Sequence, residues 1–402
     1  MSAEEQKMHQ QLWANLHGDV LEEVAMHVPI VDLLSASLVS REWRRAVCSS
    51  LVYRPHQRPW LILRDLRSPK SSAFSIHALD PYSRSWVSVT RRSISDRPFE
   101  MVGPCFMRRS TGDRFCALMF RKMTISKDPF GARWEQDTKA PRKFRLDPVV
   151  AEVGWWILVV GGECSIDRDY EEEGPVEVYD KRTGVWESAG LMPVVFEGST
   201  CAAWLSVVAS SKRLYVMERK SGWLSWFDPE SKRWGPVRQM RPDPGVSAWA
   251  ITVGYGEKLL LFGARRGTDG DAVMKVKIWE VEGDNLRVVD TEGEEMPAEM
   301  VDRLFPADEG QDATWQGYSV HVDVCGTEHG GYVCNLNPLG MRKRNGVVLF
   351  DLSRSRSRSS RMVERWEWVP LPERVGDNPM ARIFCGCSPV DFKHISSSLR
   401  RY

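Results

Sequence analysis

The residue types that most often carry out chemistry occur in this sequence without a catalytic or metal-binding arrangement. Cys385 and Cys387 form one close cysteine pair, but no second pair lies nearby to complete a zinc site, so we expect apolar core positions for these sulfurs. The eight histidines are scattered, and no nucleophile elbow, P-loop or H-E-x-x-H motif occurs. The sequence therefore predicts a non-catalytic protein with no metal and no cofactor.

The composition is that of an ordinary folded protein: 402 residues, 42% of them hydrophobic, with a formal net charge of +1. So small a net charge argues against a dedicated nucleic-acid or membrane-surface binder. The odd count of nine cysteines does not suggest a disulfide framework, and neither a glycosylation acceptor nor a signal peptide occurs. The uncharged run 198–211 is too short and too polar to cross a bilayer. We therefore expect the cytosol or the nucleus, and no membrane partner.

One stretch shows which elements organise the chain. The apolar run 155–160 stops at Gly161-Gly162, and the alternating segment 176–179 leads through a short polar turn to Trp186. This pattern predicts a buried strand, a loop, a half-buried strand, a tight turn and an outer strand. Because such a unit cannot bury its own faces, it requires neighbours of the same kind.

The neighbours are visible as a repeated spacing of aspartate and tryptophan. An Asp-x5-Trp pattern recurs at intervals of 48, 52 and 48 residues, as Asp80…Trp86, Asp128…Trp134, Asp180…Trp186 and Asp228…Trp234. Three of these four aspartates precede a proline. This arrangement suits the start of a turn, because proline restricts the backbone and an aspartate carboxylate can bond backbone amides two residues further on.

These repeats resemble the kelch repeat, whose hallmarks are an apolar strand ending in Gly-Gly and a Tyr-x6-Trp pair. Gly161-Gly162 and Tyr179…Trp186 match fully, and Phe227…Trp234 is a conservative variant. The resemblance implies a mainly β fold, a six-bladed β-propeller of four-stranded blades over residues 60–395. Residues 381–384 are then expected to complete a blade beside the first and to close the ring. The alternative is a β-sandwich with accidental turn matches.

The amino-terminal region has a different, helical pattern. Residues 1–12 are polar and are expected to be mobile, and residues 13–54 show three short amphipathic helices, with Pro29 separating the first two. Three short helices make a poor independent core, so they must bury a face against the rest of the chain or against a partner.

This helical region resembles the F-box. Val28-Pro29, Asp32-Leu33-Leu34 and the segment 39–44 stand at the matching spacings, whereas His17 replaces the usual first proline and Ser40 a common cysteine. The resemblance implies docking onto the Skp-type adaptor of a cullin–RING ubiquitin ligase, with Leu33, Leu34 and Trp43 as the first candidates for anchors. A simple helical cap on the propeller is the alternative. The candidate adaptor contacts, some of which must instead pack inside the helices, are Leu16, Val20, Leu21, Val24, Val28, Pro29, Leu33, Leu34, Val39 and Trp43.

Four further segments interrupt or flank the repeats. Residues 55–59 read as a linker and residues 396–402 as a tail. The acidic insertion 290–312 contains a candidate short helix at 297–305. The Arg/Ser run 353–361 is interpreted as a solvated turn extension, and an RNA-associated or phosphorylatable tract is the alternative.

Topology narrows the search for client-binding residues. In an up-and-down blade the loops between the second and third strands lie on the same face as the connections between blades. The polar residues expected on that face, and so the candidate client contacts, are Arg168, Asp169, Arg219, Lys220, Arg265 and Arg266.

The combined resemblance, to a plant-type F-box/kelch-repeat protein, implies a substrate receptor of a Skp–cullin–F-box ubiquitin ligase. The helical region would hold the adaptor while the propeller holds a client protein, and some relatives of this architecture recruit enzymes of phenylpropanoid metabolism. Two alternatives remain from the sequence. One is a non-degradative scaffold, and the other is an RNA-associated propeller that uses the Arg/Ser tract.

Overall fold

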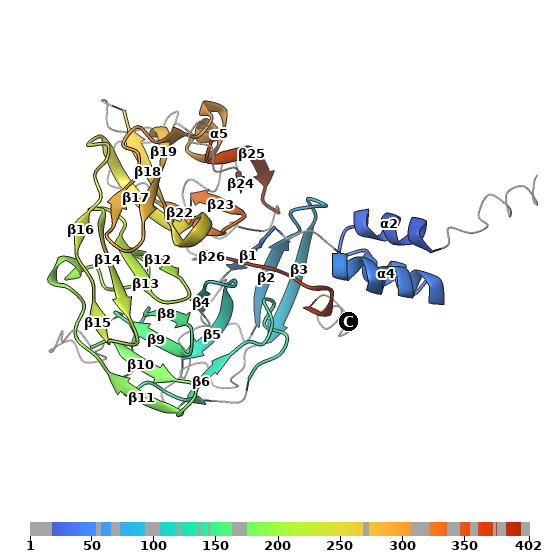
Figure 1. Cartoon of the computed structure of the whole chain (residues 1–402), viewed down its shortest axis with the longest axis horizontal. Helices are drawn as coiled ribbons and strands as arrows, with labels where there is room; N and C mark the ends of the chain where they lie inside the picture. The colour runs from blue at the N-terminus through green and yellow to red at the C-terminus, as the bar shows by residue number, and fades with distance from the viewer. Residues whose placement is uncertain are drawn as a thin grey trace, which may run out of the picture.

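The computed structural model of this chain consists of a helical module and a mainly β domain arranged like a propeller (Figure 1). Among the described residues no helix has the length and apolar character needed to cross a membrane. The described residues are 18–53, 58–65, 73–92, 105–118, 122–135, 138–143, 145–162, 175–267, 273–306, 321–335, 346–353, 361–372, 375 and 383–394.

The helical module contains α2 (Asp19–His27), α3 (Leu33–Ala36) and α4 (Arg41–Tyr53). Extended backbone at Val28 ends α2, as expected before Pro29. The hydroxyl of Ser40 accepts a hydrogen bond from the Trp43 amide at 3.1 Å and so caps the start of α4. The departure from the usual cysteine at position 40 therefore has a local structural use.

The first sheet joins the two ends of the β domain. Cys387 pairs with Leu61 and Cys385 with Leu63, so the last strand lies directly beside the first one in an antiparallel register. The expectation that residues 381–384 complete a blade beside the first was wrong. The segment 383–388 pairs with the inner edge of β1, which no other strand covers, and so belongs to the first sheet. The strand order is β26-β1-β2-β3, with β1 (Trp60–Asp65), β2 (Ala73–Leu79), β3 (Trp86–Arg92) and β26 (Ile383–Ser388).

An eight-stranded sheet follows, and it divides into two antiparallel halves. The halves meet at a parallel pair, β4 and β8, where Met107 lies opposite Val150. Its strands are β4 (Cys105–Arg109), β5 (Arg114–Leu118), β6 (Lys122–Ile125), β7 (Thr138–Lys139), β8 (Val149–Val153), β9 (Trp156–Val160), β10 (Glu177–Asp180) and β11 (Val185–Ser188).

Three further antiparallel sheets complete the domain. The third contains β12 (Leu205–Ala209), β13 (Leu214–Glu218), β14 (Trp223–Asp228), β15 (Arg233–Trp234) and β16 (Arg238–Gln239). The fourth contains β17 (Val246–Val253), β18 (Leu259–Arg266), β19 (Val273–Glu282), β20 (Arg287–Val288) and β21 (Glu294–Glu295). The fifth contains β22 (Val322–Thr327), β23 (Gly330–Asn335), β24 (Gly346–Leu352) and β25 (Val363–Pro370).

The predicted short helix in the acidic insertion is confirmed as α5 (Ala298–Leu304), which packs on β19 and β24. Two short 3-10 helices, η1 (Val194–Phe196) and η2 (Tyr255–Glu257), lie in loops of the β domain. Residues 354–360, which make up most of the Arg/Ser run, lie outside the described residues.

The sheets are arranged around a common centre (Figure 1). The inner strand of one sheet contacts the inner strand of the next, as β12 does β17, β17 does β22 and β22 does β26. Apolar residues fill the spaces between the sheets, and Phe262 of β18 and Phe350 of β24 meet across one of them with ring centroids 5.5 Å apart. The fold is therefore mainly β and propeller-like, with the helical module at its amino-terminal end.

The predicted chemistry of the repeated turns is confirmed. In all four turns the aspartate carboxylate accepts a hydrogen bond from the amide two residues on, at 2.8–3.0 Å. In two of them the aromatic pair lies directly across the strands. Tyr179 faces Trp186 with ring centroids 5.2 Å apart, and Phe227 faces Trp234 with centroids 5.3 Å apart. The aspartate fixes the turn, and the aromatic pair packs the outer strand onto its neighbour.

Candidate functional site

The predicted adaptor contacts differ in how deeply they are buried in the helical module. Leu21 and Leu33 lie in the core of the module, where they pack with Ala25, Ala46 and Val47. A fully buried side chain cannot contact a partner without unfolding its surroundings, so these two residues stabilise the module. Val24, Val28, Pro29, Leu34 and Trp43 are partly buried, and Leu16 lies outside the described residues.

Three apolar side chains in the described part of the module are exposed. Val20 is 58% exposed and Val39 68% exposed, and Leu38, which the sequence reading missed, is 67% exposed. Leu38 and Val39 follow α3 in a turn whose backbone is held by the Ser37 hydroxyl, which donates to the Leu34 carbonyl at 2.7 Å. One sequence signal could have identified Leu38. Leu38 and Val39 lie between α3 and the Ser40 cap, outside any helix, so they cannot be part of an apolar helix face.

The described end of the linker, Arg58 and Pro59, is fixed on one face of the β domain. The Arg58 guanidinium pairs with Asp351 at 2.7 Å, and the buried Tyr332 hydroxyl donates to the Pro59 carbonyl at 2.8 Å. The Arg58 amide also donates to the Tyr82 hydroxyl at 3.1 Å. We call the face that carries these contacts the linker face. The linker is thus attached both to the first sheet, through Tyr82, and to the fifth.

The opposite face carries the described client candidates. We call it the loop face, and its described part is formed by residues 139–143, 145–148, 189–204, 219–222, 239–246 and 265–267 together with His321. Lys220 and Arg265 are exposed there, and Arg266 is partly buried. Arg265 and Lys277 approach the same Asp243 carboxylate, at 3.6 and 3.7 Å. Arg168 and Asp169 lie outside the described residues.

Arg219 is built into the structure and is not a free anchor on the loop face. Its guanidinium donates to the Val322 carbonyl and to Asp323, both at 2.7 Å, and to the Leu205 carbonyl at 3.1 Å. Its own carbonyl accepts the Trp249 amide at 2.7 Å. Arg219 therefore ties the third, fourth and fifth sheets together where their inner strands begin.

Two aromatic side chains that the sequence reading missed lie beside Arg219. Trp204, just before β12, and His321, just before β22, have ring centroids 6.2 Å apart although they belong to different sheets. Burial, and then the nearby Arg219 charge, lower the pKa of His321 below its usual 6.5. No local pattern marks either residue, because their proximity depends on how the sheets pack.

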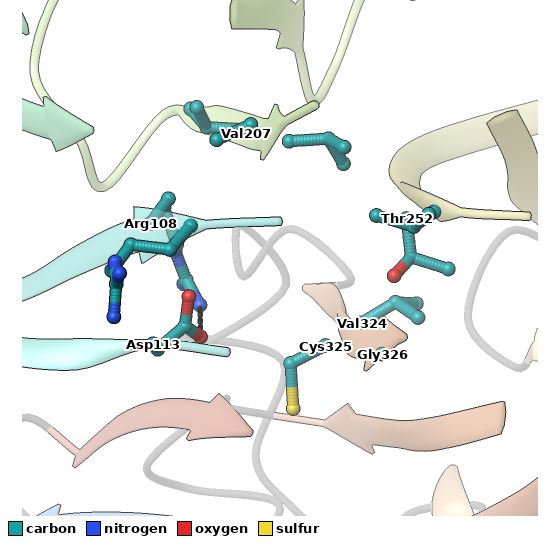
Figure 2. Close-up of a pocket in the computed structure, with 11 residues that line it drawn as sticks. Arg108, Asp113, Val207, Thr252, Val324, Cys325 and Gly326 are labelled. Atoms are coloured by element: carbon teal, nitrogen blue, oxygen red, sulfur yellow. Dashed lines mark hydrogen bonds and ion pairs between the residues drawn. The ribbon is translucent and has the colours of Figure 1, made fainter. Parts of the chain in front are cut away.

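A small cavity lies between the inner strands, toward the linker face (Figure 2). It has a volume of about 20 Å³ and is lined by residues of β4, β12, β17 and β22, including Thr252 and Cys325. Arg108 donates to Asp113 at 2.7 Å beside it, and burial raises the pKa of that carboxyl despite the arginine. The cavity holds about one water molecule, so it is not a substrate site. No cluster of metal-ligating side chains occurs among the described residues.

These features define a class of protein: a small helical module followed by a mainly β, propeller-like domain. The F-box domain model matches residues 13–55. Over 272 residues the chain is 32% identical to an F-box/kelch-repeat protein from Arabidopsis thaliana, a match that covers 67% of this chain and 66% of the relative. The chain belongs to the F-box/kelch-repeat proteins.

Proposed function

We propose that this protein is the substrate-recognition subunit of a Skp–cullin–F-box ubiquitin ligase and has no catalytic site of its own. The observation that carries the proposal is the F-box module with its exposed apolar side chains Val20, Leu38 and Val39. Apolar side chains that stay exposed beside a small, otherwise packed core mark a surface for a protein partner. The partner is a Skp-type adaptor, and through it a cullin–RING ligase.

The β domain holds the client, and its action is proximity rather than chemistry. The linker enters on the linker face, so the loop face points away from it and is open to a second protein. Holding client and ligase in one complex replaces a bimolecular encounter with an effectively intramolecular one. The client is a protein of the cytosol or nucleus, and a metabolic enzyme is the class that the resemblance favours.

The arrangement of the sheets supports a propeller of six blades. The eight-stranded sheet supplies two four-stranded halves, and the four other sheets supply one blade each. Contacts between successive inner strands run from β4 through β8, β12, β17 and β22 to β26, and β26 in turn contacts β4. The ring is then closed by β26, with residues 60–395 as the propeller and residues 13–54 as the F-box module.

Capture of a purified Skp-type adaptor and cullin tests the proposal. The variant Leu38→Ala/Val39→Ala removes exposed apolar area, so adaptor affinity should fall by roughly tenfold or more while the fold is kept. Val185→Ala/Val194→Ala is the matched control, because it removes exposed valines from the β domain and should leave capture unchanged. Leu33→Ala is unsuitable as the main test, since it empties a buried core position.

Adaptor that fails to bind the folded wild-type chain would contradict the proposal and favour a non-degradative scaffold. Equal capture by the wild type and by Leu38→Ala/Val39→Ala would show that the adaptor does not bind through these two side chains.

A further inference from the structure

Two cysteines lie directly opposite each other on neighbouring strands of the eight-stranded sheet. Cys105, the first residue of β4, pairs with Cys116 of β5 in the antiparallel register. Opposed residues of an antiparallel pair point to the same face of the sheet, and their Cα atoms are about 4.5–5.5 Å apart. A disulfide needs a Cα separation of about 4.4–6.8 Å. The backbone spacing of this strand pair therefore suits a disulfide between the two residues.

The two sulfurs are in contact, and they differ in exposure. Both cysteines are free thiols in the structure, and a hydrogen bond joins the two thiols. The Cys105 thiol also approaches the Cys116 carbonyl, to which it can donate at 3.6 Å. Cys105 is partly exposed, whereas Cys116 is fully buried. A small solute can thus reach Cys105, and the Cys116 sulfur is placed to react with whatever forms there.

The surroundings of the pair favour ionisation of one sulfur over the other. The hydrogen bond with the Cys116 thiol, together with the charge of Arg64, lowers the pKa of the Cys105 thiol, although burial and the charge of Asp147 act in the opposite direction. The same hydrogen bond and burial raise the pKa of Cys116. Because the thiolate is the nucleophilic form, Cys105 is the sulfur that attacks an oxidant first.

We propose that Cys105 and Cys116 form an oxidation site at which hydrogen peroxide makes a disulfide between β4 and β5. The Cys105 thiolate attacks one peroxide oxygen, the O–O bond breaks and hydroxide leaves, so Cys105 becomes a sulfenic acid. The Cys116 sulfur then attacks the Cys105 sulfur, the S–O bond breaks, and the hydroxyl leaves with the Cys116 proton as water. The proton first lost by Cys105 combines with the hydroxide, so two thiols are oxidised while one peroxide is reduced to two water molecules.

Two other thiol pairs separate the effect of contact from that of exposure. Cys325 is hydrogen-bonded to Cys387, and Cys334 to Cys385, and both pairs join the fifth sheet to the first. All four of these cysteines are buried, and their hydrogen bonds and burial raise the pKa of Cys325 and of Cys334. They are internal controls, because their sulfurs are in contact but closed to solvent.

Mild peroxide treatment of the full chain, followed by trypsin digestion and mass spectrometry without reduction, tests the inference. The expected product is a linked pair of tryptic peptides, 93–108 and 115–121, with the sum of their masses less two hydrogens. A thiol reductant should separate the two peptides. The four buried cysteines should stay reduced under the same treatment and react with an alkylating reagent only after denaturation.

Three variants test the role of each sulfur. Cys105→Ser should abolish the linked peptides and leave Cys116 reduced. Cys116→Ala should accumulate the sulfenic acid on Cys105, where dimedone labels it. Cys48→Ser is the matched control, because it removes an exposed thiol of α4 and should leave the yield of linked peptides unchanged. A thermal transition like that of the wild type shows that each variant is folded.

Absence of the linked peptides from the oxidised, folded wild type would overturn the inference. Disulfides that form equally fast in the buried pairs would also overturn it, as would oxidation of Cys105 to a disulfide with a cysteine other than Cys116. Both residues belong to the β domain, outside the F-box module, so none of these outcomes depends on adaptor capture.

Discussion

At the level of single residues, the double glycine shows why a sequence hallmark of the repeat is physically required. Gly161 has a φ of +62°, and a Cβ built on it would lie 2.2 Å from the Thr200 carbonyl oxygen. The Gly161 carbonyl accepts from Arg145 at 3.0 Å, and Arg145 also pairs with Glu177 at 3.2 Å in the buried interior. Residue 161 must therefore lack a side chain, because Thr200, in the connection that follows the third repeat, packs directly against its backbone.

We expect Gly161→Ala to destabilise the β domain by at least about 1–2 kcal/mol, because it adds left-handed strain and a backbone clash. Gly190→Ala is the control, since nothing lies within 4 Å of a Cβ built there, and the midpoint of its urea unfolding should match that of the wild type. A wild-type midpoint for Gly161→Ala would show that the connection through Thr200 moves aside freely.

At the level of elements, contacts from the described end of the linker fix the start of β1. Tyr332 of β23 is fully buried, and its hydroxyl holds the Pro59 carbonyl one residue before β1 begins. The Arg58–Asp351 pair holds the same segment to β24. The start of β1 is thus attached to the fifth sheet by side chains as well as to its own sheet by the backbone.

Tyr332→Phe removes the hydroxyl but keeps the ring, so it should weaken this attachment by about 1 kcal/mol. Amide hydrogen exchange in β1 that proceeds through local opening should become about fivefold faster, and mass spectrometry of the peptides that cover residues 58–65 would measure it. Tyr255→Phe, at an exposed tyrosine of η2, is the matched control. Unchanged exchange in Tyr332→Phe would contradict a stabilising role for the hydroxyl.

At the level of the whole molecule, the arrangement of sheets depends on joining its last strand to its first. β26 covers the inner edge of β1, and the indole of Trp86 donates to the Pro370 carbonyl of β25 at 2.9 Å, which links the first and fifth sheets. Without β26 the edge of β1 would be left as an open template for pairing with other chains.

A chain that ends at residue 382 should therefore lose its cooperative thermal transition and aggregate, whereas a chain that ends at residue 394 should behave like the wild type. Differential scanning calorimetry and size-exclusion chromatography would compare the two. A monomeric chain ending at residue 382 with a wild-type transition would mean that β26 is dispensable for the fold.

The sequence by itself determined the local features of this protein. The Asp-x5-Trp turns, the strands that follow them and the helices around Pro29 rest on interactions between residues close in the chain. Turn chemistry and hydrophobic periodicity identify such interactions directly. The F-box and kelch resemblances rest on the same local patterns, which is why the amino-acid sequence alone was enough to infer the family.

Only the tertiary structure decided which of these residues are available for function. Leu33 and Leu38 are both apolar residues near α3, yet packing against α2 and α4 buries the first and leaves the second exposed. Arg219 looks like a loop charge in the sequence, but Asp323 lies 104 residues further on and neutralises it. Trp204 and His321 likewise meet only because separate sheets pack around one centre. Such long-range contacts depend on the shape of the packed sheets, and no local pattern in the sequence encodes them.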